Sequence, residues 1–290
     1  MPTRTLAIGD QVGSYRIVGH LVDDTFRAVH ITTAQRALID VGSRDDWHNV
    51  SAYMVRAQRL GDLLQHPGVA KVVERGMLAD HRPWTATEVP SGIALFDLIA
   101  RRTMPATETT TLIRDVADVL AYAHARGIVH RGLTLRSIVL ATGPRAWPIA
   151  VGDWGLPAPE LGVFSAPELS TDAPHDGRAD VFALGVIAFR AATCRFPGEG
   201  GVFDVPGAPT ALATLIARML AIDPAERPTS LEVHAASAEL LGDLTAALVS
   251  DDVVRAAPRF KRPKWTPAPQ PVITSERAPT ASGEITKKPS

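Results

Sequence analysis

Five short segments between Gly127 and Pro228 concentrate residue types that handle metal ions, phosphates and protons. In chain order they are Gly127–Ser137, Asp153–Gly155, Phe164–Glu168, Asp180–Gly185 and Asp223–Pro228. The Asp153 carboxylate suits two roles, because it could bind a metal ion or could form a turn ahead of a glycine. The chain also has nine histidines, but none stands at the spacing of a zinc site. The five segments are therefore the candidates for a functional site, with no separate metal centre expected.

In this order the five segments resemble, one after another, five motifs of protein kinases. These motifs are the catalytic loop, the DFG triplet, the APE segment, the start of the F helix and the Arg-containing turn before the last helix. Each match alone is weak, but five in the correct order are highly specific. From Tyr15 to Ser250 the chain is therefore identified as similar to the eukaryotic-like Ser/Thr protein kinases of bacteria. The resemblance implies an α+β, two-lobed protein-kinase-like fold with a small β-rich N-lobe and a larger α-helical C-lobe.

Phosphoryl transfer needs several positioned groups, and this sequence departs from the family pattern at most of them. The Gly-rich loop keeps only Gly19. The strand Lys, the helix Glu, the proton-accepting Asp, the Lys two residues after it and the metal-binding Asn are here Asp40, Arg56 (or Ala57), Gly132, Thr134 and Ser137. Among the residues that handle ATP or its metal in the family, only Asp153 survives.

These substitutions argue against catalysis. A missing general base alone slows such a reaction roughly 10²–10⁴-fold. Replacing Lys by Asp at about 4 Å from a phosphate, with an effective dielectric near 20, reverses a contact worth about 4 kcal/mol. We therefore expect a pseudokinase that is not an enzyme and uses no cofactor. A nucleotide-binding sensor without turnover stays open as an alternative, as does an atypical Ser/Thr kinase with weak activity, which Asp153 supports.

The retained motifs have a structural explanation that the resemblance supplies. It implies that Glu168 pairs with Arg227 and that Asp180 holds the backbone of the catalytic loop near Arg131. Such contacts assemble the large lobe whether or not phosphate is transferred.

Asp40 and Arg56 could form an inverted ion pair in place of the family's Lys–Glu bridge, with Arg59 as the alternative partner. Such a pair would fix the helix of the small lobe without a nucleotide. The competing interpretation, that both side chains face solvent, is nearly as well supported.

Hydrophobic patterning predicts five strands and one helix, followed by a mostly helical body. The strands are expected at Tyr15–Val18, Thr25–Ile31, Ala37–Val41, Val69–Arg75 and Pro83–Val89. The helices are expected from about Trp47 to Gln65 and at Leu95–Arg101, Pro105–Arg126, Asp180–Ala192, Ala208–Ala221 and Ser230–Ser250. Short extended pieces flank Asp153.

Composition separates a tail from the folded part. Residues 256–290 contain seven prolines and carry a net charge of +5, whereas residues 1–255 carry −6. We expect an N-terminal extension (1–14), an N-lobe (15–90), a C-lobe (91–255) and a disordered, basic, Pro/Thr-rich tail (256–290). The net charge of −1 gives no global case for nucleic acid.

Compartment and membrane signals point to a soluble, cytoplasmic chain. The one cysteine, Cys194, fits a reducing compartment, and the longest uncharged apolar run, Val181–Phe189, is too short to span a bilayer. The loss of motifs resembles the intracellular pseudokinase segment of mycobacterial MviN-type proteins, a lipid II flippase family of peptidoglycan synthesis. A basic linker suits a place beside the cytoplasmic face of the plasma membrane if the chain is part of a membrane protein.

The expected function is a phosphorylation-dependent protein-recognition and regulatory module, acting in control of peptidoglycan synthesis. The expected partners are an active Ser/Thr kinase that phosphorylates the tail and a forkhead-associated domain that reads phosphothreonine there. Thr274 is the first candidate because apolar and polar residues flank it, and Ser275 and Thr280 follow. A plain spacer without a phosphosite is the competing interpretation.

Overall fold

The computed structural model describes residues 5–22, 24–42, 50, 53–55, 57–58, 60–61, 65–142, 146–154, 161–170, 176–198 and 205–250. The chain divides into one compact unit, Met1–Ala257, and a second segment, Pro258–Ser290, which lies outside the described residues. Arg56, Thr274, Ser275 and Thr280 also lie outside them. No helix among the described residues is long and apolar enough to cross a membrane.

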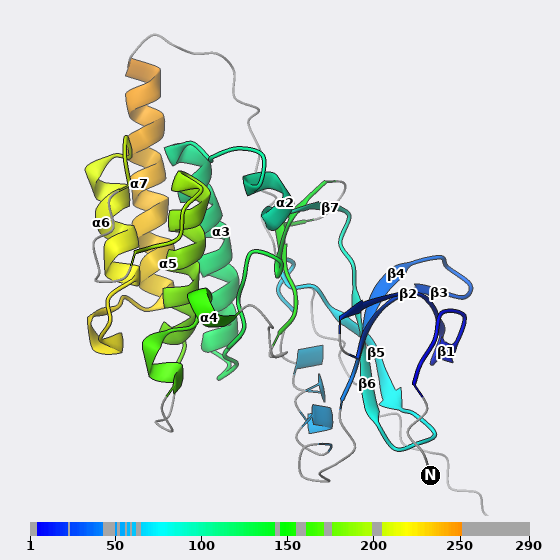
Figure 1. Cartoon of the computed structure of the whole chain (residues 1–290). Helices are drawn as coiled ribbons and strands as arrows, with labels where there is room; N and C mark the ends of the chain where they lie inside the picture. Colours follow the sequence, from blue (N-terminus) through cyan, green and yellow to red (C-terminus); the bar gives the residue numbers. More distant parts are fainter. Residues whose placement is uncertain are drawn as a thin grey trace, which may run out of the picture. The chain divides into compact units, whose positions relative to one another are not determined.

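The N-lobe is a six-stranded antiparallel sheet in the order β1-β2-β3-β4-β6-β5. Its strands are β1 (Gln11–Val12), β2 (Tyr15–Val22), β3 (Thr25–His30), β4 (Arg36–Val41), β5 (Val72–Met77) and β6 (Pro83–Glu88) (Figure 1). Alternate residues of β3 and β4 are buried, as period-two patterning requires. They form an apolar core with Tyr15, Ile17 and Trp84. Between β4 and β5, the described residues from Val50 to Gly61 are helical.

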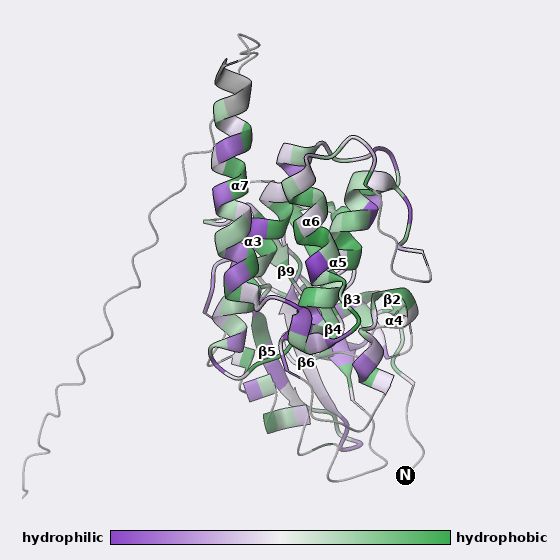
Figure 2. Cartoon of the chain, turned by 90° about the vertical axis from the view of Figure 1, so that its left-hand side faces the viewer, coloured by the Kyte–Doolittle hydropathy of each residue, from purple (hydrophilic) through white to green (hydrophobic). Residues whose placement is uncertain are grey.

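The C-lobe begins with a three-stranded sheet, β7 (Gly92–Ala94), β8 (Ile138–Ala141) and β9 (Ile149–Val151). Its helices are α2 (Leu95–Ile99), α3 (Ala106–His124), α4 (Leu161–Phe164), α5 (Arg178–Thr193), α6 (Thr210–Met219) and α7 (Ser230–Ser250), with 3₁₀ turns at Pro167–Ser170 and Pro224–Glu226. Helix α3 ends before Gly127, whose φ of 68° suits the left-handed turn after a helix. Hydrophobic residues run along α5 and α6 (Figure 2), and α5 is buried on most sides because it lies within the helical lobe. The α+β, two-lobed architecture predicted from the sequence is present.

Asp180, in the first turn of α5, ties three elements together. Its side chain is almost fully buried and accepts hydrogen bonds from the backbone N–H groups of His130 (2.7 Å) and Arg131 (2.8 Å). The His124 ring bridges Asp180 and the Ser230 hydroxyl at 2.8 Å on each side. One carboxylate therefore connects the end of α3, the following loop and the start of α7.

Arg227 is the second buried charge that organises the C-lobe. Its guanidinium contacts Glu168 through two N–H···O bonds of 2.6 and 2.9 Å. Its remaining donors bond the carbonyl oxygens of Ala221, Ile222 and Arg178. All five guanidinium donors are thereby satisfied, which is the condition under which a buried arginine is tolerated.

A backbone seam joins the two lobes. Val69 and Val151 form an isolated parallel bridge, in which Ala70 N–H donates to Val151 O (2.8 Å) and Val151 N–H donates to Gly68 O (2.7 Å). A Cβ atom on Gly68 would lie 2.5 Å from the Val119 side chain and 2.7 Å from Trp147. Only glycine therefore permits this close approach.

We expect the substitution Arg227→Met to destabilise the chain by about 3–5 kcal/mol, because it removes the buried guanidinium that bonds both Glu168 oxygens and three carbonyl groups. Urea unfolding followed by circular dichroism measures the loss. The matched control is Arg102→Met, since Arg102 pairs with Glu108 at 2.7 Å but both side chains are over 40% exposed. That variant is expected to lose less than about 1 kcal/mol. Equal losses in the two variants would contradict the role given to Arg227.

Candidate functional site

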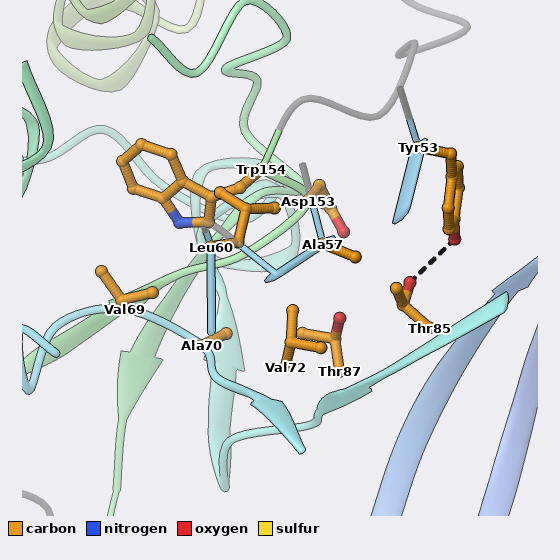
Figure 3. A pocket seen from close by; sticks show the side chains of 10 residues that line it. All are labelled: Tyr53, Ala57, Leu60, Val69, Ala70, Val72, Thr85, Thr87, Asp153 and Trp154. Carbon is orange, nitrogen blue, oxygen red and sulfur yellow. Dashed lines mark hydrogen bonds between the residues drawn. The ribbon is translucent and has the colours of Figure 1, made fainter. Parts of the chain in front are cut away.

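A small pocket lies between the inner face of the N-lobe sheet and the chain that follows β9 (Figure 3). Its lining comprises Tyr53, Ala57, Leu60, Val69, Ala70, Val72, Thr85, Thr87, Asp153 and Trp154. The volume is about 40 Å³, enough for a few water molecules. These ten residues include no Lys or Arg, so the lining offers hydroxyls and a carboxyl but no cation.

Asp40 lies on β4, and its carboxyl accepts hydrogen bonds from two hydroxyl groups. The Tyr53 hydroxyl is 3.0 Å from Asp40 Oδ2 and 2.9 Å from Thr85 Oγ1, and Thr25 donates to Asp40 Oδ1 at 3.2 Å. Burial raises the pKa of Asp40, and the hydrogen bonds from Tyr53 and Thr25 oppose that effect. The charges of Asp24 and Asp153 raise the same pKa further.

Asp153 is half-buried at the pocket and has a φ of 56°. That left-handed conformation is one that Asp tolerates better than most residues. Burial raises the pKa of Asp153, while the neighbouring His130 and a hydrogen bond from Ser137 counteract it. The site therefore brings together two carboxyls that both resist ionisation.

His130 and Trp154 support the Asp153 turn from within the core. The fully buried His130 ring contacts Gly152 O through Nε2 (2.8 Å) and Gly132 N–H through Nδ1 (3.3 Å). This pair of partners suits the neutral ring, and burial lowers the pKa of His130. The Trp154 indole packs on that ring at 4.7 Å and donates to Val151 O.

The loop from Gly132 to Ser137 has hydrogen bonds among its own residues. Thr134 and Ser137 are buried, and their hydroxyls lie 3.3 Å apart. The Ser137 hydroxyl also donates to Gly132 O at 3.4 Å and accepts the Thr134 N–H at 3.3 Å. Gly132 brings no side chain to this loop, so the Thr134 and Ser137 hydroxyls bond within it, and Ser137 also bonds Asp153.

The structure places Asp40 and Asp153 near one pocket and Gly132, Thr134 and Ser137 in the adjacent loop. The expected Asp40–Arg56 pair involves a residue outside the described part of the chain, as does the alternative with Arg59. The sequence interpretation did not include Tyr53 among the candidate site residues. The signal that could have indicated Tyr53 is its spacing in the sequence, since it stands three residues before the position expected to face Asp40 and i, i+3 residues of a helix are neighbours.

The chain has named relatives among bacterial kinases, although no protein-family model matches it. The serine/threonine-protein kinase PknJ of Mycobacterium tuberculosis is 31% identical over 229 residues, covering 67% of this chain and 39% of PknJ. Pkn2 of Myxococcus xanthus is 26% identical over 249 residues, covering 74% of this chain and 29% of that kinase. The chain thus spans less than half the length of these curated relatives.

Solved structures give the same assignment. A double mutant of the M. tuberculosis PknI kinase domain matches with a TM-score of 0.67 at 26% identity, over 82% of this chain and 100% of that domain. A second PknI kinase-domain structure matches with a TM-score of 0.62 at 27% identity, over 81% of this chain and 99% of that domain. The protein-kinase-like fold is therefore confirmed, and the homologues are bacterial Ser/Thr kinases of the eukaryotic-like type.

The expectation that the chain is not an enzyme is wrong by this comparison. Relatives such as PknJ and Pkn2 are named serine/threonine-protein kinases, which points to an enzyme. Aligned positions in the sequence do not determine which side chains the fold brings to the pocket. In the folded chain the Asp153 carboxyl still lies at the pocket, with Asp40 close enough to influence its surroundings.

We expect Asp40→Asn to stabilise the chain at neutral and alkaline pH. The pKa of Asp40 in the folded chain exceeds its unfolded value, which is about 3.9. The protonated carboxyl therefore contributes its full stabilisation below the unfolded pKa, and this contribution is lost as the pH rises through the folded pKa. The advantage of the Asn variant should therefore grow from pH 4 to pH 8, by about 1.4 kcal/mol for every pH unit between the two pKa values.

Urea midpoints of the parent and the variant across this pH range measure the effect. Asp243→Asn, on the exposed side of α7, is the matched control and should follow the parent at every pH. A constant difference between Asp40→Asn and the parent would contradict the assignment.

Proposed function

We propose that the chain is a regulatory protein-recognition domain of Ser/Thr kinase signalling. The main support is the difference between the buried charges that organise the C-lobe and the residues that line the pocket. Asp180 and Arg227 have their hydrogen bonds satisfied, whereas the ten residues that line the pocket offer no cation to a phosphate. A kinase-like body of this kind can present surfaces to other proteins.

The proposed domain boundaries are 15–90 for the N-lobe, 91–255 for the C-lobe and 256–290 for the tail. The tail is the proposed regulatory element. In this proposal an active Ser/Thr kinase phosphorylates Thr274, with Ser275 and Thr280 as secondary sites. A forkhead-associated domain then binds the phosphothreonine through its Arg-lined loops. The tail's proline content and net charge of +5 support this role, since an extended segment is accessible to a kinase.

Control of peptidoglycan synthesis is the proposed setting. The support is the resemblance of the substituted motif positions to the pseudokinase segment of MviN-type proteins. The basic tail suits a position at the cytoplasmic face of the plasma membrane, where anionic lipids attract Lys and Arg. The membrane would be reached only through a longer parent chain.

A second candidate is an atypical Ser/Thr kinase with weak activity. Asp153 at the pocket and the names of the relatives favour it. In that role Asp153 would be the group that contacts a nucleotide-bound metal ion. A nucleotide sensor without turnover would use the same residue.

Phosphorylation of the tail is the first test. The chain is incubated with an active kinase of this family and ATP, the phosphosite is mapped by mass spectrometry, and a forkhead-associated domain is titrated by calorimetry. We expect Thr274→Ala to weaken binding at least about 10-fold, because each charge-assisted hydrogen bond to phosphate contributes roughly 1.5–3 kcal/mol. Thr266→Ala is the matched control. Unchanged affinity of phosphorylated Thr274→Ala would refute this site.

The second test concerns phosphoryl transfer. We expect labelled phosphate to be transferred at least roughly 10²-fold more slowly than by the PknI kinase domain, since Gly132 cannot act as a general base. Gly132→Asp alone should leave the rate low, because Asp40 still opposes phosphate. Asp153→Asn should abolish the remaining transfer and any rise in Tm caused by ATP and Mg²⁺. Transfer at the PknI rate, or transfer insensitive to Asp153→Asn, would contradict the second candidate.

A further inference from the structure

Three arginines lie on one face of the N-lobe sheet, on the neighbouring strands β2, β3 and β4 (Figure 1). They are Arg16, Arg27 and Arg36, one on each strand, and all three are exposed. In the register of the sheet, Val29 lies directly opposite Arg16 on one side and Arg36 on the other. Arg27 stands two residues before Val29 on β3, so its side chain leaves the same face. We call these three residues the arginine cluster.

The three side chains are close enough to meet over Val29. Directly opposite residues of an antiparallel pair have Cβ atoms about 4.5–5.5 Å apart, and diagonal neighbours are within reach of long side chains. The pairing of β2 and β3 shifts at Gly19, which lies opposite Arg27. A Cβ atom on Gly19 would lie 3.8 Å from Arg27 Cβ and 3.9 Å from its Cδ. The stem of Arg27 therefore lies alongside the glycine, within the area that the cluster encloses.

The arginine cluster has no acceptor in the part of the chain that the structure describes. No described residue accepts a hydrogen bond from its side chains or forms an ion pair with them. Other arginines of the body do have acidic partners, since Arg102 pairs with Glu108 at 2.7 Å and Arg178 pairs with Asp176 at 2.9 Å. The cluster therefore presents three positive charges to solvent, on a body whose residues 1–255 carry a net charge of −6.

The rest of this face is apolar beside the cluster. Among the described residues of β2, β3 and β4 that share the face, one is acidic, and it is Asp40. The Asp40 carboxyl accepts hydrogen bonds from the Tyr53 and Thr25 hydroxyls, not from the cluster. Val18 is 50% exposed and Val29 is half-buried. The cluster therefore surrounds an apolar surface and faces no competing carboxylate.

A phosphate monoester matches the arginine cluster better than a carboxylate does. At neutral pH a phosphorylated side chain carries about −1.5 to −2 charges and offers three strong acceptor oxygens. A carboxylate carries a single charge on two oxygens. Three guanidinium groups directed at one point match the larger charge and the larger number of acceptors. The methyl group of phosphothreonine suits the apolar surface that Val18 and Val29 provide beside the arginines.

A short protein segment suits the cluster better than a lipid surface. The net charge of −6 over residues 1–255 opposes the approach of the whole body to an anionic bilayer. A short segment meets only the charges within about 8–10 Å, which is the screening distance at physiological salt. Within that distance the arginine cluster dominates the face.

We propose that the arginine cluster binds a phosphothreonine in an extended segment of a partner protein. The inference goes beyond the proposed function, in which the tail of this chain is the phosphorylated element. Here the N-lobe is the reader, and it acts whether or not Thr274 is phosphorylated.

Fluorescence polarisation with the full, unphosphorylated chain tests the proposal. The probes are three pools of labelled ten-residue peptides with mixed uncharged flanks and a central phosphothreonine, Glu or Thr. We expect the phosphothreonine pool to bind at least about 10-fold more tightly than the Glu pool, and the Thr pool to bind most weakly. Vesicles that contain phosphatidylserine and a phosphoinositide test the lipid alternative. Binding of these vesicles without binding of the phosphothreonine pool would overturn the proposal.

Variants then assign the binding to the cluster. Arg27→Gln should lower the affinity for the phosphothreonine pool at least about 10-fold, and Arg27→Lys should retain part of it. The double variant with Arg16→Gln and Arg36→Gln should lose at least as much. Arg218→Gln, at an exposed position of α6, is the matched control and should bind like the parent. Urea midpoints close to that of the parent establish that each variant is folded.

The tail is a second basic element, and the same variants separate it from the cluster. Binding of the peptide through the tail, whose net charge is +5, would leave the affinity of the cluster variants unchanged and would refute the site. Equal affinity for the phosphothreonine and Glu pools, or no binding of the phosphothreonine pool, would also refute it. Thr274→Ala should bind the pool like the parent, so failure of this site is distinguishable from failure of the tail phosphosite.

Discussion

The buried carboxylate of Asp180 is the interaction on which the rest of the C-lobe depends. A charge removed from water is tolerated only when hydrogen-bond donors replace its hydration, and here two backbone N–H groups and the His124 ring do so. The same bonds hold the loop after α3 against the start of α5. The loop's conformation is therefore set by an acceptor outside it, and does not require a side chain at Gly132.

The contacts that stabilise the C-lobe are therefore distinct from the residues that line the pocket. Arg227 and Asp180 lie among helices and turns, whereas Asp40 and Asp153 lie where the two lobes meet. Substitutions in the pocket can therefore change its charge without removing the bonds that support the helices. The structure thus accounts for a kinase-like body that coexists with unusual pocket residues.

The sequence predicted the large elements well and the contacts between elements poorly. The five expected strands lie within a few residues of β2 to β6, because alternation over six to eight residues is a strong signal. Strands as short as β1 and β7 carry no such periodicity. The hydrogen bond from Tyr53 to Asp40 joins residues 13 positions apart on different elements, and no local pattern encodes it. The family resemblance, not periodicity, indicated the Glu168–Arg227 pair.

The seam between Val69 and Val151 has a consequence for how the chain folds. Val69 and Val151 are separated by roughly 80 residues, so closing this bridge costs more loop entropy than pairing neighbouring strands. The hairpins of the N-lobe and the helix pairs of the C-lobe can form from nearer contacts first. Joining the lobes is therefore expected among the late steps of folding, and the tight fit of Gly68 against Val119 and Trp147 can be completed only then.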